Sequence, residues 1–570
     1  MQYKLIDGSA NDRTDVIGTV LNNRGIEDVY SYLHLDDSFC EDYLHLDNIE
    51  AAVECFAKHV DNGDRISVLV DCDPDGYCSA AMIVKYLKNI EYSYPVSYII
   101  HKHNKVHGLT KIDEGDIIIP AETKLLVIPD AGSNDIVQLN DLVASGIDCI
   151  VLDHHEKEPC DIKCNAIVVN NQMSENYSNK EFSGAGVVYE FLRALDDIYW
   201  LDVADNTLDL VALAQVSDIM DLRSFPTRYY VNEGFRFIRN SMLDELIESQ
   251  NFSMNGQVNP TTIAFNVTNI LNALIRIGTY EERDLLFRAF VNYYEEFDYK
   301  KRSGEIVKED TCERAVRFCK NSKSKQDRMR DKLFESCVGK ANLDDKIVII
   351  EADDADSGII GLSAMKLSSE LKRPVVLLRD IGDGKLGGSI RNFDNSPIED
   401  LKAVLNSTGL CEVRGHSNAA GIEIMRENLE TLRDTLNEQL ADITYDSTYL
   451  CDFVLDFNEL DLRFINDLSD YDWIWGTGVK APLVAVTGIS VTRKDLVVQG
   501  KDLNSVAFEY DGIKYVAFKL SNDNPLLQFA SDWGDKEEKI ILDAVVTCGI
   551  NFYKGIAQPQ CIIKDFNTTK

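Results

Sequence analysis

Five short apolar runs in the first 170 residues are each followed by polar residues. They are 66–70, 95–100, 125–128, 149–152 and 166–169, and β-favouring residues dominate them. Between the first two runs, apolar residues recur at helical spacing over 80–90, and an apolar helix is expected at 208–214. Strands that alternate with helices over 64–222 predict a parallel, doubly wound α/β sheet.

Acidic residues gather at the ends of these predicted strands. The first run leads into Asp71-Cys72-Asp73-Pro74-Asp75-Gly76, where an extended chain would point the three acids to one side. The alternative is a solvated turn, because Asp, Pro and Gly are turn formers. Asp130 follows the third run and Asp153-His154-His155 follows the fourth, although two adjacent histidines are also common in polar loops. Carboxyl ends of parallel strands share one edge of a sheet, so we expect these side chains to meet.

The collected residues have the chemistry of a hard metal site. The candidate ligands are Asp73, Asp75, Asp130, His154 and Asp218, with Asp71 and Asp153 in support. Four carboxylates and one imidazole suit Mn²⁺ or Mg²⁺ better than a thiolate-bound zinc. More acids than one ion needs suggest two ions roughly 4 Å apart. One ion would lower the pKa of a bound water, and both would stabilise charge on a phosphate and its leaving oxygen.

Length, charge and cysteine content narrow the class of protein. The 570 residues should form three or four domains. A net charge of −37 argues against a general polyanion binder. Residues 300–340 run against this trend with 13 basic and 7 acidic residues, which fits either a solvated helix face or a basic element facing nucleic acid. The 14 scattered cysteines, the lack of a secretory signal and of a membrane-length apolar stretch predict a cytoplasmic protein, in a host cell if viral, without membrane contact.

The motifs resemble, in order, those of the DHH phosphoesterase superfamily and best its RecJ branch, the single-strand-specific exonucleases. Segments 71–76 and 106–109 look like the first two motifs. Asp130 sits in the third, Asp153-His154-His155 gives the superfamily its name, and Asp218 looks like the acid of the fourth. Further matching segments are 272–276, which resembles a RecJ core segment, and 358–361, 373–376, 389–391 and 414–421, which resemble the DHH-associated domain.

The resemblance implies a domain order and a fold class. We expect an N-terminal helical segment (1–60), a doubly wound parallel-sheet DHH catalytic domain (61–285), a helical connector (286–340), a second α/β DHH-associated substrate-binding domain (341–445) and a C-terminal OB-like β-barrel (446–570). Helices with a break near 23–25 are expected over 15–60. Alternation around Asp511-Gly512 predicts a hairpin in the last domain, and a second hairpin is expected around Lys554-Gly555.

The resemblance also implies residue roles. Asp73, Asp75, Asp130, His154 and Asp218 would bind the metals, Asp130 as a bridge, and His155 would contact the scissile phosphate. Substrate phosphates would be held by Lys102, Arg276, Ser389, Arg391, Gly415 and His416. The sequence departs from the family pattern at four places. Leu69 stands where some members have a histidine, Lys102 replaces an arginine, Arg414 replaces a glycine, and Val106-His107 replaces Gly-Tyr, which leaves the preferred substrate end open.

The implied function is metal-dependent hydrolysis of single-stranded DNA, 5′ to 3′, with release of 5′-mononucleotides in recombination, repair or replication. A single-strand-binding protein or a helicase is the implied partner. Two alternatives stay open: a phosphoesterase of short oligonucleotides or cyclic dinucleotides, and an inactive replication scaffold. The acidity of the C-terminal domain weakens a DNA-groove interpretation. Six of its aromatic residues are available to stack on bases, of which we expect most to be core and one or two at most to stack: Trp473, Trp475, Phe508, Tyr510, Tyr515 and Phe518.

Overall fold

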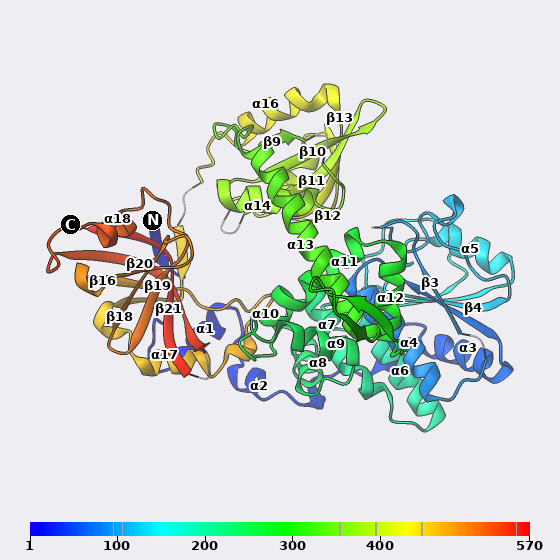
Figure 1. Ribbon diagram of the computed structural model, residues 1–570. Coiled ribbons are helices and arrows are strands. Elements are labelled where there is room, and N and C mark those ends of the chain that lie inside the picture. The colour runs from blue at the N-terminus through cyan, green and yellow to red at the C-terminus, as the bar shows by residue number, and fades with distance from the viewer. Residues whose placement is uncertain are drawn as a thin grey trace. The chain divides into compact units, whose positions relative to one another are not determined.

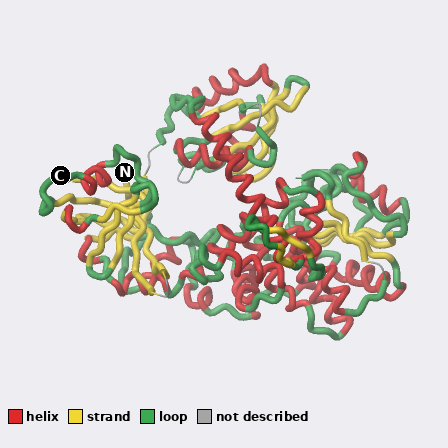
Figure 2. Tube along the Cα trace, in the orientation of Figure 1, coloured by secondary structure: helices red, strands yellow, loops and turns green. Residues whose placement is uncertain are grey.

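The computed structural model describes residues 1–94, 96–104, 106–352, 355–393, 396–445, 448–553 and 556–569. The chain divides into two compact units, Met1–Lys4 with Lys323–Cys451 and Leu5–Ser322 with Asp452–Lys570 (Figure 1). Strands gather into two five-stranded sheets, one seven-stranded sheet and two strand pairs (Figure 2). Across the described ranges, no helix combines the length and the apolar character that a membrane crossing needs.

The first five-stranded sheet contains all five strands predicted from the apolar runs. They are β2 (Arg65–Val70), β3 (Val96–Ile100), β4 (Thr123–Pro129), β5 (Asp148–Asp153) and β6 (Ile167–Asn170). The order is β3-β2-β4-β5-β6, and every neighbouring pair is parallel. Pro95, which the sequence placed in the second strand, lies outside the described residues. The chain reverses its winding between β2 and β4, and this switch point is where open α/β sheets bind ligands.

Both faces of this sheet are covered, which explains why its strands are continuous apolar runs. On β2, Val68 and Val70 pack into the core that contains α3 (Ile49–Asn62), α4 (Pro74–Asn89) and α6 (Gly184–Tyr199). Leu69, between them, packs on the other face with residues of α5 (Ile136–Ala144). Figure 1 shows α5 on one side of the sheet and α3, α4 and α6 on the other.

The N-terminal segment is less helical than predicted. The helices are α1 (Val16–Asn23) and α2 (Val29–Leu33) before α3, and the break near 23–25 is present. Residues 34–48, however, contain only the short turns η1 (Asp37–Phe39) and η2 (Tyr43–His45). The side chains of Asp36 and Asp42 accept hydrogen bonds from the backbone two residues ahead. Such local bonds compete with helix formation, so the prediction of continuous helix was wrong here.

A helical layer follows the sheet in sequence and leads to the connector. Its elements are α7 (Leu208–Ser217), α8 (Phe225–Arg236), α9 (Ser241–Gln250), α10 (Pro260–Thr262), the π-helical η5 (Ile263–Thr268), α11 (Asn269–Ile277) and α12 (Tyr280–Phe290). The connector, expected to be helical, begins with an antiparallel pair, β7 (Phe297–Lys300) and β8 (Ile306–Glu309), before α13 (Thr311–Val338). This strand pair was not predicted from the sequence.

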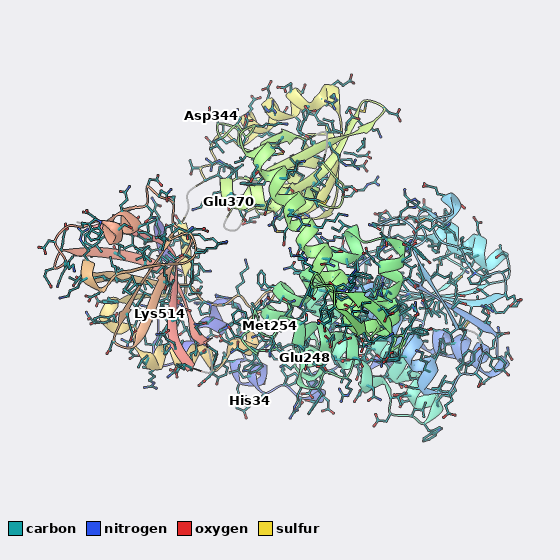
Figure 3. The ribbon with its side chains drawn as sticks, in the orientation of Figure 1. His34, Glu248, Met254, Asp344, Glu370 and Lys514 are labelled. Atoms are coloured by element: carbon teal, nitrogen blue, oxygen red, sulfur yellow. The ribbon has the colours of Figure 1, made fainter. Side chains whose placement is uncertain are left out.

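Much of the positive charge in 300–340 is compensated locally. Arg317 forms an ion pair with Glu309, and Lys323 and Arg330 both pair with Asp327 on α13. These pairs favour the solvated-face interpretation of the basic segment over a nucleic-acid surface. Exposed acids such as Glu248, Asp344 and Glu370 project from both units (Figure 3), consistent with the strongly negative net charge.

The unit formed mainly by 323–451 contains the second α/β domain. Its sheet has the order β12-β13-β11-β10-β9, in which only β9 and β10 are parallel. The strands are β9 (Val348–Glu351), β10 (Val375–Gly382), β11 (Lys385–Arg391), β12 (Cys411–His416) and β13 (Ala419–Met425). The helices are α14 (Ile360–Leu371), α15 (Leu401–Ser407) and α16 (Leu429–Gln439). β1 (Gln2–Leu5) pairs with β14 (Thr448–Cys451).

The C-terminal domain is a seven-stranded sheet of order β15-β16-β20-β21-β19-β18-β17. Its strands are β15 (Phe453–Asp456), β16 (Val484–Thr492), β17 (Val497–Gln499), β18 (Ser505–Tyr510), β19 (Ile513–Ala517), β20 (Lys539–Tyr553) and β21 (Ile556–Thr569), with helices α17 (Leu462–Ser469) and α18 (Pro525–Ser531). The predicted hairpin at Asp511-Gly512 is present, and both residues have the positive φ of a type I′ turn. β20 and β21 also pair, although Lys554 and Gly555 lie outside the described residues.

This domain docks on the helical layer through a buried arginine. Arg228 of α8 is fully buried and donates to the backbone oxygens of Ile474 (3.0 Å) and Trp473 (2.6 Å). Its guanidinium also lies 5.2 Å from the Trp473 ring centroid. Arg24 and Asp452 form a second link, with two short hydrogen bonds. These contacts join the sheet domain and the C-terminal domain within one unit.

Candidate metal centre

The acidic loop after β2 is a helix start and not an extended segment. Asp73 is the N-cap of α4 and accepts a hydrogen bond from the Gly76 backbone (2.9 Å), while Pro74 occupies the first helical position. Asp75 therefore lies in the first turn of α4. The prediction that strand alternation points the three acids to one side was therefore wrong.

Asp75 is held by four donors, three at the start of α6 and one, Ser79, on its own helix α4. Its carboxylate accepts bonds from the Gly184 and Ala185 backbone (both 2.8 Å) and from the hydroxyls of Ser79 and Ser183. The helix N-terminus favours this buried negative charge. Asp75 thus ties α4 to α6, and its oxygens already have partners. The Gly184 segment is therefore a close-packing contact between α4 and α6.

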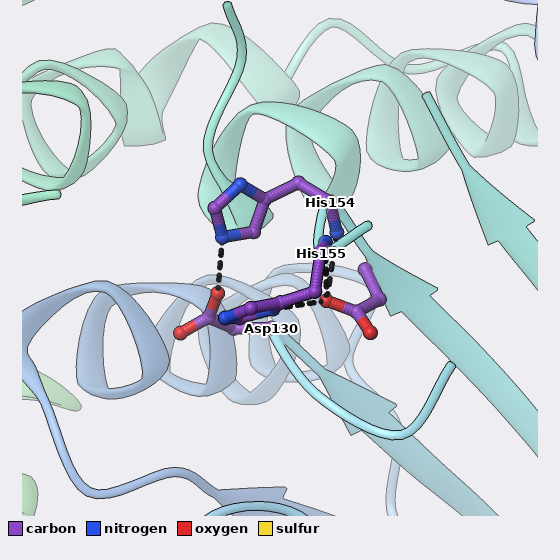
Figure 4. A group of neighbouring side chains, drawn as sticks. Asp130, His154 and His155 are labelled. Atoms are coloured by element: carbon purple, nitrogen blue, oxygen red, sulfur yellow. Dashed lines mark hydrogen bonds and ion pairs between the residues drawn. The ribbon is translucent and has the colours of Figure 1, made fainter. Parts of the chain in front are cut away.

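Asp130 has the opposite surroundings. It follows β4 with a left-handed φ of 63°, it is buried, and neither of its oxygens has a hydrogen-bond partner among the described residues. A Cβ at Gly184 would lie 2.4 Å from Oδ1, so only glycine fits beside it. The Nε2 atom of His154, also without a hydrogen-bond partner, lies 3.3 Å from Asp130 Oδ1 (Figure 4). Buried oxygens and an imidazole that face one another unsatisfied are the signature of a cation site.

Two ligand groups share this edge of the sheet. Donor atoms of Asp71, Asp73 and Asp130 lie within 4.8 Å of one another, as do those of Asp75, His154 and Asp218. Asp218, at the end of α7, places its Oδ2 3.4 Å from His154 Nε2. The structure therefore brings all the predicted ligands together. The mostly oxygen donor set fits Mn²⁺ or Mg²⁺.

The crowding of the carboxylates raises the pKa values of several of them. Burial, followed by the charges of Asp71 and Asp75, raises the pKa of Asp73 to about 6. Burial and the neighbouring acids also raise the pKa values of Asp130 and Asp218 well above their usual range. A divalent cation would relieve this repulsion.

Asp153 organises the loop that carries both histidines. It is buried and accepts bonds from the backbones of Ser133 (2.9 Å) and His154 (2.7 Å) and from His155 Nδ1 (2.8 Å). Burial acts to raise the pKa of Asp153. The hydrogen bond from His155 and the positive charge of that ring outweigh burial, so the pKa of Asp153 lies below its usual range. Burial alone would lower the pKa of His155, but Asp153 raises it. Asp153 thus positions His155, whose ring remains 40% exposed.

Asp71 has two imidazole neighbours to which the sequence analysis gave no role. His107 Nδ1 lies 2.7 Å from Asp71 Oδ2, and the Gly108 backbone donates to Oδ1. His101 follows β3, beside Asp71 at the end of β2, and its buried Nε2 lies 3.7 Å from Asp71 Oδ1 without a hydrogen-bond partner. Nδ1 of His101 is fixed by Asp116 at 2.6 Å. An imidazole nitrogen therefore reaches Asp71 from β3, although position 69 is a leucine. The signal was available, because His101 ends a strand just as the acids do.

The expected substrate-binding residues lie in both units. In the sheet domain, Lys102 is exposed with its Nζ 2.6 Å from the Gly115 oxygen, and Arg276 is half-buried at the end of α11. The Asn104 side chain donates to the Arg276 oxygen (2.9 Å), so the loop of Lys102 packs on that helix end.

The other four share one sheet in the second unit. Arg391 donates to Ser389 Oγ at 2.7 Å on β11, and a Cβ at Gly361 would lie 2.7 Å from the Arg391 guanidinium. On β12, Gly415 and His416 are exposed. His416 and Arg391 both pair with Ala419 of β13, so they lie in one row across the sheet.

Comparisons with known proteins agree with this architecture. The profile of the DHH family N-terminal domain matches residues 65–215, that of the DHHA1 domain 344–442, and that of the RecJ OB domain 451–565. The chain is 36% identical over 582 residues to a SPbeta prophage-derived protein of Bacillus subtilis strain 168, provisionally named single-strand DNA-specific exonuclease YorK, covering 100% of this chain and 99% of that one. It is 23% identical to the single-stranded-DNA-specific exonuclease RecJ of the same strain, covering 97% and 68%.

A solved structure shares the fold. RecJ from Thermus thermophilus in complex with Mn²⁺ superposes with a TM-score of 0.73 at 18% identity, covering 100% of this chain and 79% of that one. A second structure of that protein contains Mg²⁺. The sheet, the ligand cluster and the domain order define a DHH phosphoesterase. Within that superfamily, the chain belongs to the RecJ family of single-strand-DNA-specific exonucleases, as its motifs indicated.

Proposed function

We propose that this protein is a metal-dependent exonuclease that hydrolyses single-stranded DNA from the 5′ end and releases 5′-mononucleotides, in DNA recombination, repair or replication. The observation that carries the proposal is the pair of unpartnered, buried Asp130 oxygens facing His154 within a carboxylate cluster. Family membership supplies the substrate class. A single-strand-binding protein or a helicase is the proposed partner, in a cytoplasm that keeps the 14 free cysteines reduced.

We assign the metal ligands by whether their oxygens already accept hydrogen bonds from the protein. Asp71, Asp73 and Asp130 form one ligand group, and His154 and Asp218 form the core of the other, with Asp130 between them. When bound, divalent ions supply Lewis acidity that lowers the pKa of water and offsets negative charge at the scissile phosphate. The Asp75 oxygens already accept hydrogen bonds, so we expect Asp75 to contribute less to metal coordination than the other acids. Its main role is to fix α4 against α6, which also fixes the positions of Asp73 and Asp130.

His155 is the proposed donor to the scissile phosphate. The Asp153 carboxylate holds its Nδ1 and raises its pKa. The raised pKa favours the protonated ring, and Nε2–H then points away from Asp153 as a charge-assisted donor. Asp153 keeps this orientation through its backbone bonds to the same loop.

We propose that 61–285 is the catalytic domain, 341–445 grips substrate and 446–570 is the OB domain, with 1–60 and 286–340 as flanking segments. Arg391 and Ser389, joined by a hydrogen bond, offer a fork and a hydroxyl to phosphate oxygens. Lys102, Arg276, Gly415 and His416 supply further phosphate donors. The Lys102 ammonium is a point charge and cannot form the bidentate contact of an arginine.

The test uses single-stranded DNA labelled at either end, with Mn²⁺ and with EDTA. The proposal expects early release of labelled mononucleotide from the 5′ label only, and no release after chelation. Asp130→Asn should abolish release, because it removes the shared ligand. Asp209→Asn is the matched control, since Asp209 is equally buried but accepts bonds from the Arg239 and Asn240 backbones, outside the cluster.

Other outcomes would redirect the assignment. Intact long DNA together with rapid cleavage of dinucleotides would indicate a small-substrate phosphoesterase. Release from the 3′ label first would reverse the polarity. No cleavage of any substrate, with no Mn²⁺ bound, would indicate a scaffold.

A further inference from the structure

A cluster of metal-ligand side chains lies at the edge of the first sheet opposite the metal centre. Donor atoms of Cys55, His59 and Asp148 lie within 4.8 Å of one another. Cys55 and His59 are four residues apart on α3, which places them on one face of that helix. Asp148 is the first residue of β5, whereas Asp153 is the last. The two ends of this strand are about 16 Å apart, so the cluster is separate from the metal centre.

His59 has the orientation of a metal-binding histidine. It is 5% exposed, its Nδ1 lies 2.8 Å from Asp64 Oδ2, and its Nε2 lies 2.9 Å from Asp148 Oδ2. A metal-bound imidazole usually donates its other N–H to a carboxylate, which fixes the tautomer and the plane of the ring. Asp64, directly before β2, is in the position of that carboxylate. With Nδ1 held, Nε2 faces Asp148 in the group that also contains Cys55.

An ion-pair bridge alone explains less of this arrangement. A protonated His59 between two carboxylates would satisfy both ring nitrogens, and Lys58 Nζ also lies 3.2 Å from Asp148 Oδ2. Such a bridge gives no reason for a thiol one helical turn before the imidazole and within the same group. The Lys58 side chain is 61% exposed, so its ammonium is free to move into solvent when another cation binds Asp148.

The chemistry of the three donors selects the kind of ion. One thiolate, one imidazole and one carboxylate suit Zn²⁺, whereas Mn²⁺ and Mg²⁺ prefer the oxygen-rich set of the metal centre. Donors bound to a tetrahedral zinc ion at about 2.0–2.3 Å lie roughly 3.3–3.8 Å apart, so small side-chain rotations bring these three into place. Cys55 is half-buried and the Asp148 side chain is 46% exposed, so water can supply the fourth ligand.

We infer that Cys55, His59 and Asp148 form a zinc site that is separate from the metal centre at the other edge of the sheet. As the ion binds, the thiol proton of Cys55 and any proton on His59 Nε2 pass to solvent, and water fills the fourth position. The ion ties α3 of the N-terminal segment to the start of β5, and both belong to one compact unit. Its role is structural, and the inference does not depend on the proposed function.

The first test uses Co²⁺, which occupies zinc sites and absorbs strongly in the near ultraviolet when a thiolate binds it. The carboxylates and the imidazole of the metal centre give no such band. Titration of the full-length protein with cobalt chloride should produce a thiolate band that saturates at a single equivalent, and Zn²⁺ should then remove it. Cys55→Ser should lose the band. Cys72→Ser is the matched control, because Cys72 is also half-buried but lies beside the metal centre, between Asp71 and Asp73.

The second test measures thermal unfolding with Zn²⁺ in an Asp130→Asn background, in which the metal centre lacks its shared ligand. Zn²⁺ at about 100 times its dissociation constant should raise the Tm by about 5–10 °C. Adding Cys55→Ser or His59→Gln should remove most of this shift, because each variant lacks one protein ligand. Adding Asp64→Asn should weaken Zn²⁺ binding roughly 10- to 100-fold, the loss typical of a carboxylate that orients a metal-bound histidine.

Three results would overturn the zinc site. A wild-type protein without a thiolate band would leave His59 as an ion-pair bridge between Asp64 and Asp148. A band that persists in Cys55→Ser, or that is lost in Cys72→Ser, would place the bound thiolate elsewhere. Equal Zn²⁺ shifts in Tm with and without Cys55→Ser, in the Asp130→Asn background, would show that the ion binds at another site. None of these results bears on the exonuclease, which the end-labelled DNA tests separately.

Discussion

Asp130→Asn should abolish turnover and yet stabilise the metal-free protein. The wild-type carboxylate is buried without a hydrogen bond and shares a 4.8 Å neighbourhood with Asp71 and Asp73. At an effective dielectric constant of 20, each such pair of charges costs about 3.5 kcal/mol. Protonation limits the total, because neutralising an ordinary Asp at pH 7.5 costs about 5 kcal/mol. His107 also offsets the charge of Asp71. We therefore expect Asp130→Asn to raise the free energy of unfolding of the metal-free protein by about 2–4 kcal/mol.

Thermal unfolding in EDTA and in Mn²⁺ would measure this effect. At about 2–4 °C per kcal/mol for a domain of this size, Asp130→Asn should unfold several degrees above wild type in EDTA. Mn²⁺ should raise the Tm of wild type strongly and that of the variant little. Asp209→Asn should lower the Tm in both conditions, because its carboxylate accepts two short backbone bonds. An Asp130→Asn protein less stable than wild type in EDTA would refute the electrostatic reasoning.

The raised pKa values predict how the folding stability of the metal-free protein changes with pH. The pKa of Asp73 is raised to about 6, and those of Asp130 and Asp218 are raised further, chiefly by burial. The folded state therefore binds more protons than the unfolded state above pH 4. Their contribution to stability is present at low pH and is lost as pH rises, through about pH 6 for Asp73. In EDTA, these groups should make the catalytic domain more stable at pH 5.5 than at pH 8, and Mn²⁺ should reverse the trend because protons compete with it.

Three further substitutions test other parts of the structure. His101→Ala should weaken Mn²⁺ binding roughly 10- to 100-fold by calorimetry, and unchanged affinity would exclude a role for this imidazole beside Asp71. Arg391→Ala should raise KM for DNA about tenfold or more while the Mn²⁺ affinity stays constant, so an unchanged KM would count against phosphate binding. Arg228→Ala should destabilise the docking of the C-terminal domain by about 2–6 kcal/mol, because the backbone oxygens of Trp473 and Ile474 lose their buried donor. Limited proteolysis should then release that domain, and wild-type resistance would contradict the prediction.

The local pattern of the chain predicted much of the fold. Short continuous apolar runs rich in β-favouring residues indicated strands covered on both faces, and all five appear in one parallel sheet. Competition between side-chain hydrogen bonds and helix formation was harder to predict from the sequence. Asp36 and Asp42 look like ordinary polar residues of a helix, but their side chains bind the backbone and end helix formation over 34–48. The strand pair β7–β8 was missed because each strand is only four residues long, so that the alternation in Phe297-Asp298-Tyr299-Lys300 covers too few residues to distinguish a strand.

Most of the candidate ligands could be grouped from the sequence, because residues at the carboxyl ends of parallel strands must share one edge of a sheet. The tertiary structure alone decided the surroundings of each candidate ligand. Asp75 and Asp130 are both buried acids after strands, yet the start of α6 gives Asp75 three donors, beside one from Ser79, and gives Asp130 none. His101 reaches Asp71 only because β3 pairs with β2 in register. Hydrogen-bond supply and strand register depend on segments far apart in the chain, so no local pattern can report them.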